Sequence, residues 1–167
     1  IYPFINTINN NDILKKTKGL IITRSPLNNY RKDDYSNPRY VEYKKTLALI
    51  NNNKLNIKIL LNVENDDKIN FLLSSKVFIL ISTADNGPRA ACEAMQLGLP
   101  ILVSKNMGVS CFIKSGENGE VINNMNELTT KLPNLIQNYN KYKYRHPILN
   151  IDYAYELLKN KINSLIK

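Results

Sequence analysis

The order of short apolar runs along the chain constrains its fold more than any other feature. These runs are rich in β-branched residues, and they alternate with segments that have helical spacing. Strands are predicted at Gly19–Thr23, Ile57–Val63, Val77–Thr83, Ile101–Ser104 and Glu120–Ile122. Apolar strands that alternate with helices predict an α/β, Rossmann-like fold, in which a parallel sheet of about five strands has helices on both faces.

The helices are predicted from proline positions and apolar spacing. Pro38 opens a helix with Tyr40, Tyr43, Leu47 and Ile50 on one face, and a compact helix is expected over Pro88–Leu97. Further helices are expected over about Asp67–Ser75, over Glu127–Tyr139, with an interruption or bend near Pro133, and over Asp152–Ile166. The polar, Asn-rich residues 1–18 are expected to be an incoming interdomain connector, and residues 19–167 a single domain.

The net charge of +9 is spread along the chain, with 13 basic and 7 acidic residues in 1–84 and 10 and 7 in 85–167. Such an excess favours anionic ligands such as phosphates. Solvated lysines on helix faces remain the alternative for any single lysine. A nucleic-acid-binding domain is a third interpretation, but the even distribution argues against it, so no nucleic-acid partner is expected.

Several classes of protein are disfavoured by what the sequence lacks. It has no apolar run long enough for a membrane span and no signal-peptide pattern at Ile1. Cys92 and Cys111 are too few for a disulfide framework, and with the single His146 they make a poor zinc site. We therefore expect a cytoplasmic protein that needs no metal or other cofactor.

The segment from Ser82 to Gly119 carries the candidate chemistry. A tight turn, Asp85-Asn86-Gly87, leads from a strand into the helix that Pro88 is expected to open. Unpaired amides and the helix dipole make such an N-terminus an anion site, and Gly87 lets a ligand approach the backbone closely. Arg89 either adds a charge-assisted contact or points to solvent.

Glu93 lies one to two turns into that helix among small neighbours. A carboxylate in such a place needs a partner, and the vicinal hydroxyls of a ribose are a natural one, because one carboxylate accepts two hydrogen bonds from a diol. An exposed helix glutamate with a nearby lysine explains the same spacing. Spacing alone leaves both interpretations open.

Asp85 and Glu93, eight residues apart and followed by Ala94-Met95 and Gly98-Leu99-Pro100, resemble the acidic-x7-Glu motif of retaining GT-B glycosyltransferases, especially glycosyltransferase family 4. Residues 106–119 run without gaps against that family's Gly-Gly-x-x-Glu-x-Ile-x-x-Gly-x-x-Gly pattern, and Glu127-Leu128 match its usual helix start. The resemblance implies the C-terminal, nucleotide-sugar-binding half of a GT-B fold over residues 19–167.

The resemblance also implies roles for individual residues. Glu93 would hold the nucleotide ribose, Asp85 would contact the donor sugar, and the amides of Asn86 and Gly87 would face the sugar and phosphates. Arg24, with Arg31 or Lys32 as a second cation, would clamp the diphosphate. No metal is implied, because fixed cations and a helix N-terminus offset the charge of the leaving nucleoside diphosphate.

The sequence departs from the family at several positions. Asp85 replaces the usual Glu, Asn86-Gly87-Pro88 replaces Gly-Phe-Gly, and Cys111 stands where the family often has Glu. Pro88 removes one amide donor. The segment between residues 53 and 76 has room for one strand and one helix where the family commonly has two such units.

The expected function is transfer of a glycosyl group from a nucleotide sugar to a hydroxyl of a glycan or other acceptor, with retention of configuration. The acceptor side would come from an N-terminal domain of the same protein, so the isolated domain is expected to bind nucleotide without catalysing transfer. The departures at Asp85 and Pro88 support an alternative, a non-catalytic domain of the same ancestry used in assembly or partner binding.

Overall fold

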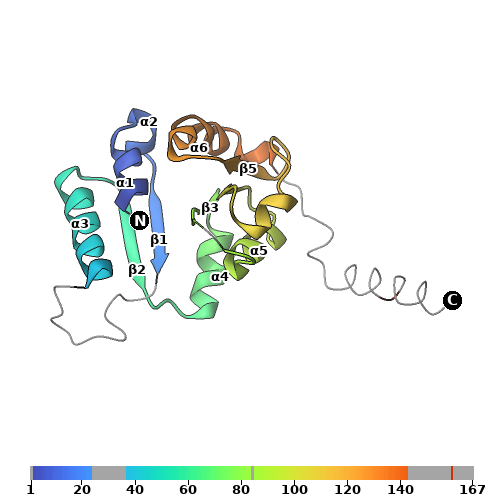
Figure 1. The fold of residues 1–167 in the computed structure, drawn as a ribbon, viewed down its shortest axis with the longest axis horizontal. Coiled ribbons are helices and arrows are strands. Elements are labelled where there is room, and N and C mark those ends of the chain that lie inside the picture. The colour runs from blue at the N-terminus through green and yellow to red at the C-terminus, as the bar shows by residue number, and fades with distance from the viewer. Residues whose placement is uncertain (1, 24–36, 84, 143–158, 160–167) are drawn as a thin grey trace. The chain divides into compact units, whose positions relative to one another are not determined.

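The computed structural model describes residues 2–23, 37–83, 85–142 and 159 (Figure 1). The chain divides into two compact units, Ile1–Asn70 and Phe71–Lys167. The α/β class is confirmed, and every strand ladder is parallel. The ladders among the described residues form two sheets, one of two strands and one of three, where the sequence predicts one sheet of about five strands.

The first unit is built on a two-stranded parallel sheet. Strands β1 (Gly19–Thr23) and β2 (Ile57–Leu61) pair with Gly19 opposite Ile57. Helix α3 (Pro38–Asn52) lies in the connection between them, as parallel strands require. It starts as predicted, with Pro38 in its first turn and the Asn37 side chain capping the amide of Arg39 at 2.9 Å.

Residues 1–18 contain two helices that the sequence analysis does not predict. These are α1 (Tyr2–Asn9) and α2 (Asp12–Lys15), and α1 packs against α3 (Figure 1). Ile5, Ile8 and Leu14 are buried, because their spacing places Ile5 and Ile8 on one helix face despite the polar composition. Whether this segment also connects domains stays a prediction.

The second unit carries a three-stranded parallel sheet in the order β3-β4-β5. The strands are β3 (Phe78–Leu80), β4 (Ile101–Ser104) and β5 (Gly119–Ile122). In the central strand Ile101, Leu102 and Val103 are fully buried, as expected for a parallel strand covered on both faces. Helix α4 (Asn65–Leu73) leads into this unit from the first.

The remaining elements of the second unit are helical. Helix α5 (Arg89–Gln96) packs against β3 and β4, and helix α6 (Leu128–Gln137) packs against β5. Short 3-10 turns occupy Gly108–Phe112, Met125–Glu127 and Tyr139–Lys141. Helix α6 continues through Pro133, so it is not interrupted there, while the alternative of a bend stays a prediction. Of the helix predicted over residues 152–166, the structure describes only Lys159, which is helical; the rest lies outside the described residues.

A hydrophobic core joins helices α4 and α5 to the sheet of this unit. Its buried members come from α4, α5, β4 and the loop after β4: Leu72, Ala91, Ala94, Met95, Ile101, Val103, Met107 and Val109. The two alanines on the buried face of α5 let the helix lie close to the sheet. In the described part of the chain, no helix is both long and apolar enough to cross a membrane.

Candidate functional site

The N-terminal end of α5 is the first component of the candidate site. Pro88 is buried and adopts an extended conformation, with φ −66° and ψ 110°, so the helix begins at Arg89, one residue later than predicted. The amides of Ala91 and Cys92 donate to the Pro88 carbonyl at 3.0 and 3.3 Å. The amides of Arg89 and Ala90 precede these bonds in the first helical turn, where the helix dipole favours an anion.

The turn before the helix, Asp85-Asn86-Gly87, is exposed. The Gly87 amide donates to Oδ1 of Asp85 at 3.2 Å, which folds the carboxylate over its own turn. A methyl group built on Gly87 would meet no atom of the described residues within 4 Å. The space beside this backbone is therefore open, and a ligand can approach it closely.

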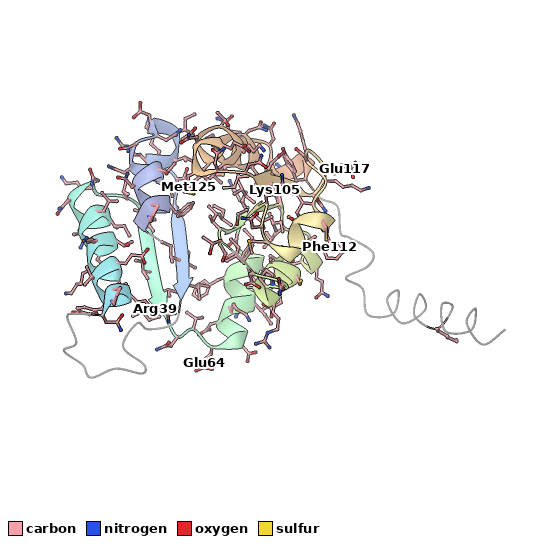
Figure 2. All side chains as sticks on the ribbon, viewed as in Figure 1. Arg39, Glu64, Lys105, Phe112, Glu117 and Met125 are labelled. Carbon is pink, nitrogen blue, oxygen red and sulfur yellow. The ribbon has the colours of Figure 1, made fainter. Side chains whose placement is uncertain are left out.

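A second loop holds this turn in place through the main chain. Residues 105–112 follow β4, and the labels of Lys105 and Phe112 mark the two ends of the loop in Figure 2. Asp85 forms an isolated parallel bridge with Met107, and the Gly108 amide donates to the Asp85 carbonyl at 2.7 Å. The Met107 side chain is buried in the core, so the turn is anchored to the core through this loop.

The carboxyl ends of β3 and β4 are joined by one hydroxyl group. Ser104 Oγ donates to the carbonyl of Ser82 at 2.5 Å and accepts from the amide of Ser82 at 3.0 Å. The Ser104 side chain thus takes the place of the main-chain hydrogen bonds between β3 and β4 at the point where the two strands separate. The candidate residues of the turn and α5 follow this edge of the sheet, which is the edge where ligands bind in open parallel sheets.

Glu93 occupies the fifth position of α5 and is half-buried, and its Oε2 atom is fully buried. Burial raises the pKa of the neighbouring Cys92 thiol, and the negative charge of Glu93 raises it further. The carboxylate therefore lies in a partly desolvated position. That position differs from the exposed helix glutamate of the alternative interpretation, while a role for Glu93 in binding stays a prediction.

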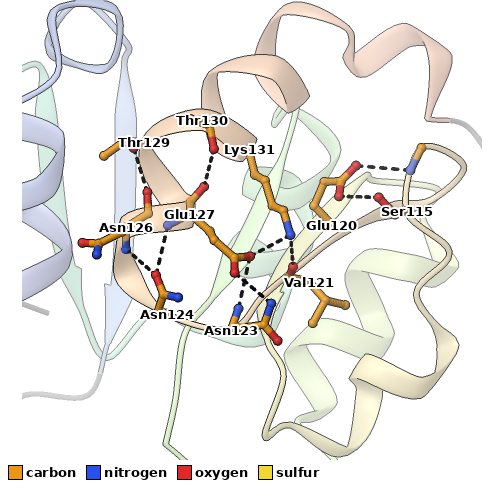
Figure 3. Close-up of polar contacts among 11 residues, drawn as sticks. Ser115, Glu120, Val121, Asn123, Asn124, Asn126, Glu127, Thr129, Thr130 and Lys131 are labelled. Atoms are coloured by element: carbon orange, nitrogen blue, oxygen red, sulfur yellow. Dashed lines mark hydrogen bonds and ion pairs between the residues drawn. The ribbon is translucent and has the colours of Figure 1, made fainter.

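A second polar cluster stabilises the segments on either side of β5 (Figure 3). The carboxylate of Glu120, only 6% exposed, accepts from Ser115 Oγ at 2.6 Å and from the Gly116 amide at 3.2 Å. It also accepts from the Tyr142 hydroxyl at 3.2 Å. Burial, and then the charge of Glu120, raise the pKa of Tyr142. This cluster joins the turn at residues 115–119 to Tyr142, which follows the 3-10 turn Tyr139–Lys141.

A third group of contacts joins the end of β5 to the start of α6 (Figure 3). Lys131 Nζ donates to the Val121 carbonyl at 2.6 Å and to Oε2 of Glu127 at 2.8 Å. Glu127 also accepts from the side-chain amide of Asn123 at 2.8 Å. These bonds orient α6 on the sheet.

The structure gathers five of the predicted site residues into one continuous turn and helix: Asp85, Asn86, Gly87, Arg89 and Glu93. The predicted diphosphate cations Arg24, Arg31 and Lys32, and also His146, lie outside the described residues. Among the residues that the structure does describe, no group of three or more His, Cys, Asp or Glu side chains is placed to hold a metal ion.

A family model described as "Glycosyl transferases group 1" matches residues 37–147, which is more than half of the chain. The chain belongs to this family. The match confirms the resemblance inferred from the motif around Asp85 and Glu93. It includes the turn, α5, the loop after β4 and α6. A comparison with curated protein sequences found no match.

Solved structures of low sequence identity share the fold of this group 1 glycosyl transferase chain. Anabaena HepE, in complex with UDP and glucose, is 15% identical with a TM-score of 0.68, over 97% of this chain and 44% of that one. A second HepE structure, in complex with UDP-glucose, is 16% identical with a TM-score of 0.66, over 94% and 44%. Sucrose-phosphate synthase from Thermosynechococcus elongatus is 14% identical with a TM-score of 0.67, over 99% and 42%. The chain thus spans less than half the length of these proteins.

Sequence reasoning missed three residues that shape the candidate site: Ser104, Met107 and Gly108. The sequence places Gly108 in the family-like run 106–119 but assigns it no contact. A serine at the end of an apolar strand, followed four residues later by a glycine, is the only local signal. It becomes informative once the bridge between Asp85 and Met107 is known.

Proposed function

We propose that this chain is the donor-binding part of an enzyme that transfers a glycosyl group from a nucleotide sugar to a hydroxyl of a glycan or other acceptor. The observation that carries the proposal is the family match, which spans the exposed turn, α5 and Glu93. HepE, a protein of similar fold, is described in complex with UDP and with UDP-glucose. We therefore take UDP and UDP-glucose as the first probes.

In the proposed complex, the diphosphate lies over the first turn of α5. The amides of Arg89 and Ala90 point from this turn, and the helix dipole adds a partial positive charge. Glu93 accepts hydrogen bonds from the two ribose hydroxyls, and Asp85 contacts the donor sugar beside the open backbone of Gly87. These assignments follow the family motif. The turn that carries Asp85 and Gly87 is exposed, and Glu93 is half-buried.

The proposed chemistry is loss of a nucleoside diphosphate, which gathers negative charge as the glycosidic bond to it breaks. Positive groups fixed around the phosphates stabilise that charge most in the transition state. We assign this task to the start of α5, to Arg89 and Arg24, and to Arg31 or Lys32. We propose that the reaction retains the configuration at the sugar and needs no metal ion.

We further propose that an N-terminal domain of the same protein binds the acceptor. This proposal is supported by the coverage of HepE and sucrose-phosphate synthase, of which the chain matches 44% and 42%. The isolated chain is then expected to bind nucleotide without catalysing transfer. A cytoplasmic location is proposed from the free cysteines Cys92 and Cys111, the second of which is exposed.

Calorimetric titration of the chain with UDP, GDP and their sugars tests donor binding. We expect at least one of them to bind, and Glu93→Gln and Arg24→Ala to weaken that binding. Loss of one charge-assisted hydrogen bond corresponds to roughly a tenfold increase in Kd. Glu117→Gln is the matched control, because Glu117 is exposed and lies 3.6 Å from Lys114 Nζ. No binding by any nucleotide, or equal weakening by the control, would contradict the proposal.

A non-catalytic domain of the same ancestry is the second candidate. It is favoured by the position of Pro88, which is buried at the start of α5 and has no amide to offer a phosphate. The two candidates differ in the full-length protein. The enzyme releases UDP from its bound nucleotide sugar when acceptors are supplied, whereas the non-catalytic protein binds the same nucleotide and leaves it intact.

A further inference from the structure

Gly108 lies against the turn that carries Asp85, and it touches that turn in two ways. Its amide donates to the Asp85 carbonyl at 2.7 Å. A methyl group on its Cα would overlap the carbonyl oxygen of Asn86 and lie 2.7 Å from the carbonyl carbon. Real Cβ atoms do not approach backbone this closely, so any other residue at position 108 must displace one of the two segments.

The loop around Gly108 is the less able of the two segments to move. Its neighbours Met107 and Val109 are 2% and 1% exposed, and both belong to the core that seats α5. The Ser110 hydroxyl donates to the Lys105 carbonyl at 2.9 Å, and the Cys111 thiol donates to the Gly108 carbonyl at 3.0 Å. The loop is therefore held on both sides of Gly108.

The turn is freer to move than the loop, because Asp85, Asn86 and Gly87 are all exposed. A methyl group on Gly87 would meet no described atom within 4 Å, so the exposed turn has room on that side to shift. A side chain at position 108 would push the turn outwards and leave α5 in place, since α5 is anchored separately through Ala91 and Ala94. The displacement would move Asp85 relative to Glu93.

We infer that Gly108 is a positioning residue that sets where Asp85 meets the donor sugar. The inference rests on the proposed function, in which Asp85 contacts the sugar and Glu93 the ribose. Gly108 itself touches no substrate and acts through the turn. It therefore governs the extra affinity that the sugar adds to the nucleotide.

The test compares Gly108→Ala with Val109→Ala in titrations with UDP and UDP-glucose. We expect Gly108→Ala to weaken the binding of UDP-glucose more than that of UDP, so that the ratio of UDP-glucose to UDP affinity falls roughly tenfold, as for one charge-assisted hydrogen bond. Val109→Ala removes buried core atoms from the same loop and adds no atom beside the turn. This control should lower the melting temperature and leave the ratio of UDP-glucose to UDP affinity unchanged. Gly108→Ala would give the same result if the role of Gly108 were merely structural.

A second measurement needs no ligand. The Gly108 amide should exchange slowly with solvent in the wild type, because it is bonded to Asp85, and this protection should disappear in Gly108→Ala. The Lys105 amide, bonded to the Ile122 carbonyl at 2.9 Å, should stay protected in both. If Gly108→Ala does not fold, the exchange rate of the Gly108 amide in the wild type still tests whether this amide is bonded to Asp85.

The outcomes separate the inference from the proposed function. Fast exchange of the Gly108 amide in the wild type, or an unchanged affinity ratio in a folded Gly108→Ala, overturns the inference while donor binding stands. A wild type that binds neither these two probes nor the other nucleotides refutes the proposed function, and the role for Asp85 with it. Slow wild-type exchange would then still establish the contact between the loop and the turn.

Discussion

Glu127 is the carboxylate whose ionisation the fold changes most clearly among the described residues. Hydrogen bonds from Lys131 and then from Asn123 lower its pKa from 4.5 to about 2. A group whose pKa is lower in the folded state stabilises the fold at pH values above its unfolded pKa. Its contribution is therefore complete above about pH 4.5 and is lost as the pH falls towards 2.

This pH dependence is testable with Glu127→Gln. Glutamine does not titrate, so the variant should melt below the wild type at pH 5 and above, and the difference should narrow between pH 4.5 and 2. Differential scanning calorimetry across this range measures it. The melting temperature of Glu117→Gln, which changes an exposed carboxylate, should depend on pH in the same way as that of the wild type. A gap for Glu127→Gln that stays constant with pH would contradict the assignment.

The buried carboxylate of Glu120 is stabilised by hydrogen-bond donors, and removing one of them should lower the stability of the fold. Tyr142→Phe removes the hydroxyl that donates to Oε1 and leaves the carboxylate buried with fewer partners. We expect the free energy of unfolding to fall by about 1–3 kcal/mol, the cost of an unsatisfied buried group. Urea denaturation measures this loss. Tyr139→Phe, at a half-buried position outside this cluster, serves as the control and should cost less.

At the scale of single residues, the sequence predicts the motif but not its surroundings. The eight-residue spacing of Asp85 and Glu93 is visible in one dimension, because both lie in one turn and helix. The contact of Gly108 with Asn86 joins residues 22 positions apart. No local pattern reveals which loops lie side by side, so this part of the site emerges only from the fold.

Among the elements, β5 shows how closely two strands can be packed. A methyl group on Gly119 would overlap the carbonyl of Ile101 on β4. We expect Gly119→Ala to force the strands apart and to cost about 1–3 kcal/mol of stability, as overpacked sites do. Chemical denaturation compares it with Gly87→Ala, which has open space around the added methyl group and should retain the stability of the wild type. Equal losses would show that the spacing of β4 and β5 is not limiting.

Elements with strong apolar patterns were predicted with the correct type, and two strands with the correct bounds. Gly19–Thr23 and Ile101–Ser104 coincide with β1 and β4, because each is a continuous apolar run between breaking residues. The strand predicted over Val77–Thr83 shortens to Phe78–Leu80, since the chain leaves the sheet near Ser82. Helices α1 and α2 were missed because asparagine-rich composition conceals their few buried positions.

For the whole molecule, the charge of +9 and the proposed donor site predict stabilisation by a nucleotide. A ligand that binds only the folded state adds about 2.7 kcal/mol to its stability at 100 times its Kd. We expect UDP at that concentration to raise the melting temperature of the wild type and to have a smaller effect on Glu93→Gln. Sodium sulfate at equal ionic strength is the control. An equal shift with sulfate would indicate general anion binding.

The fold class follows from the sequence because alternating strands and helices leave few arrangements. Strand pairing is less accessible. The expected sheet of about five strands is described as separate two- and three-stranded sheets, since pairing depends on contacts between distant segments. The cations after β1 also lie beyond what the structure describes, so Arg24, Arg31 and Lys32 stay predictions.

The hold on Asp85 has a practical consequence for redesign. The carbonyl of this residue accepts from the Gly108 amide, and the carboxylate accepts from the Gly87 amide of its own turn. Backbone placement and side-chain length are thus separable at position 85. Asp85→Glu lengthens the acid by one methylene and should keep the main-chain bond of position 85, so this variant separates the reach of the carboxylate from the placement of the turn in tests of the proposed donor site.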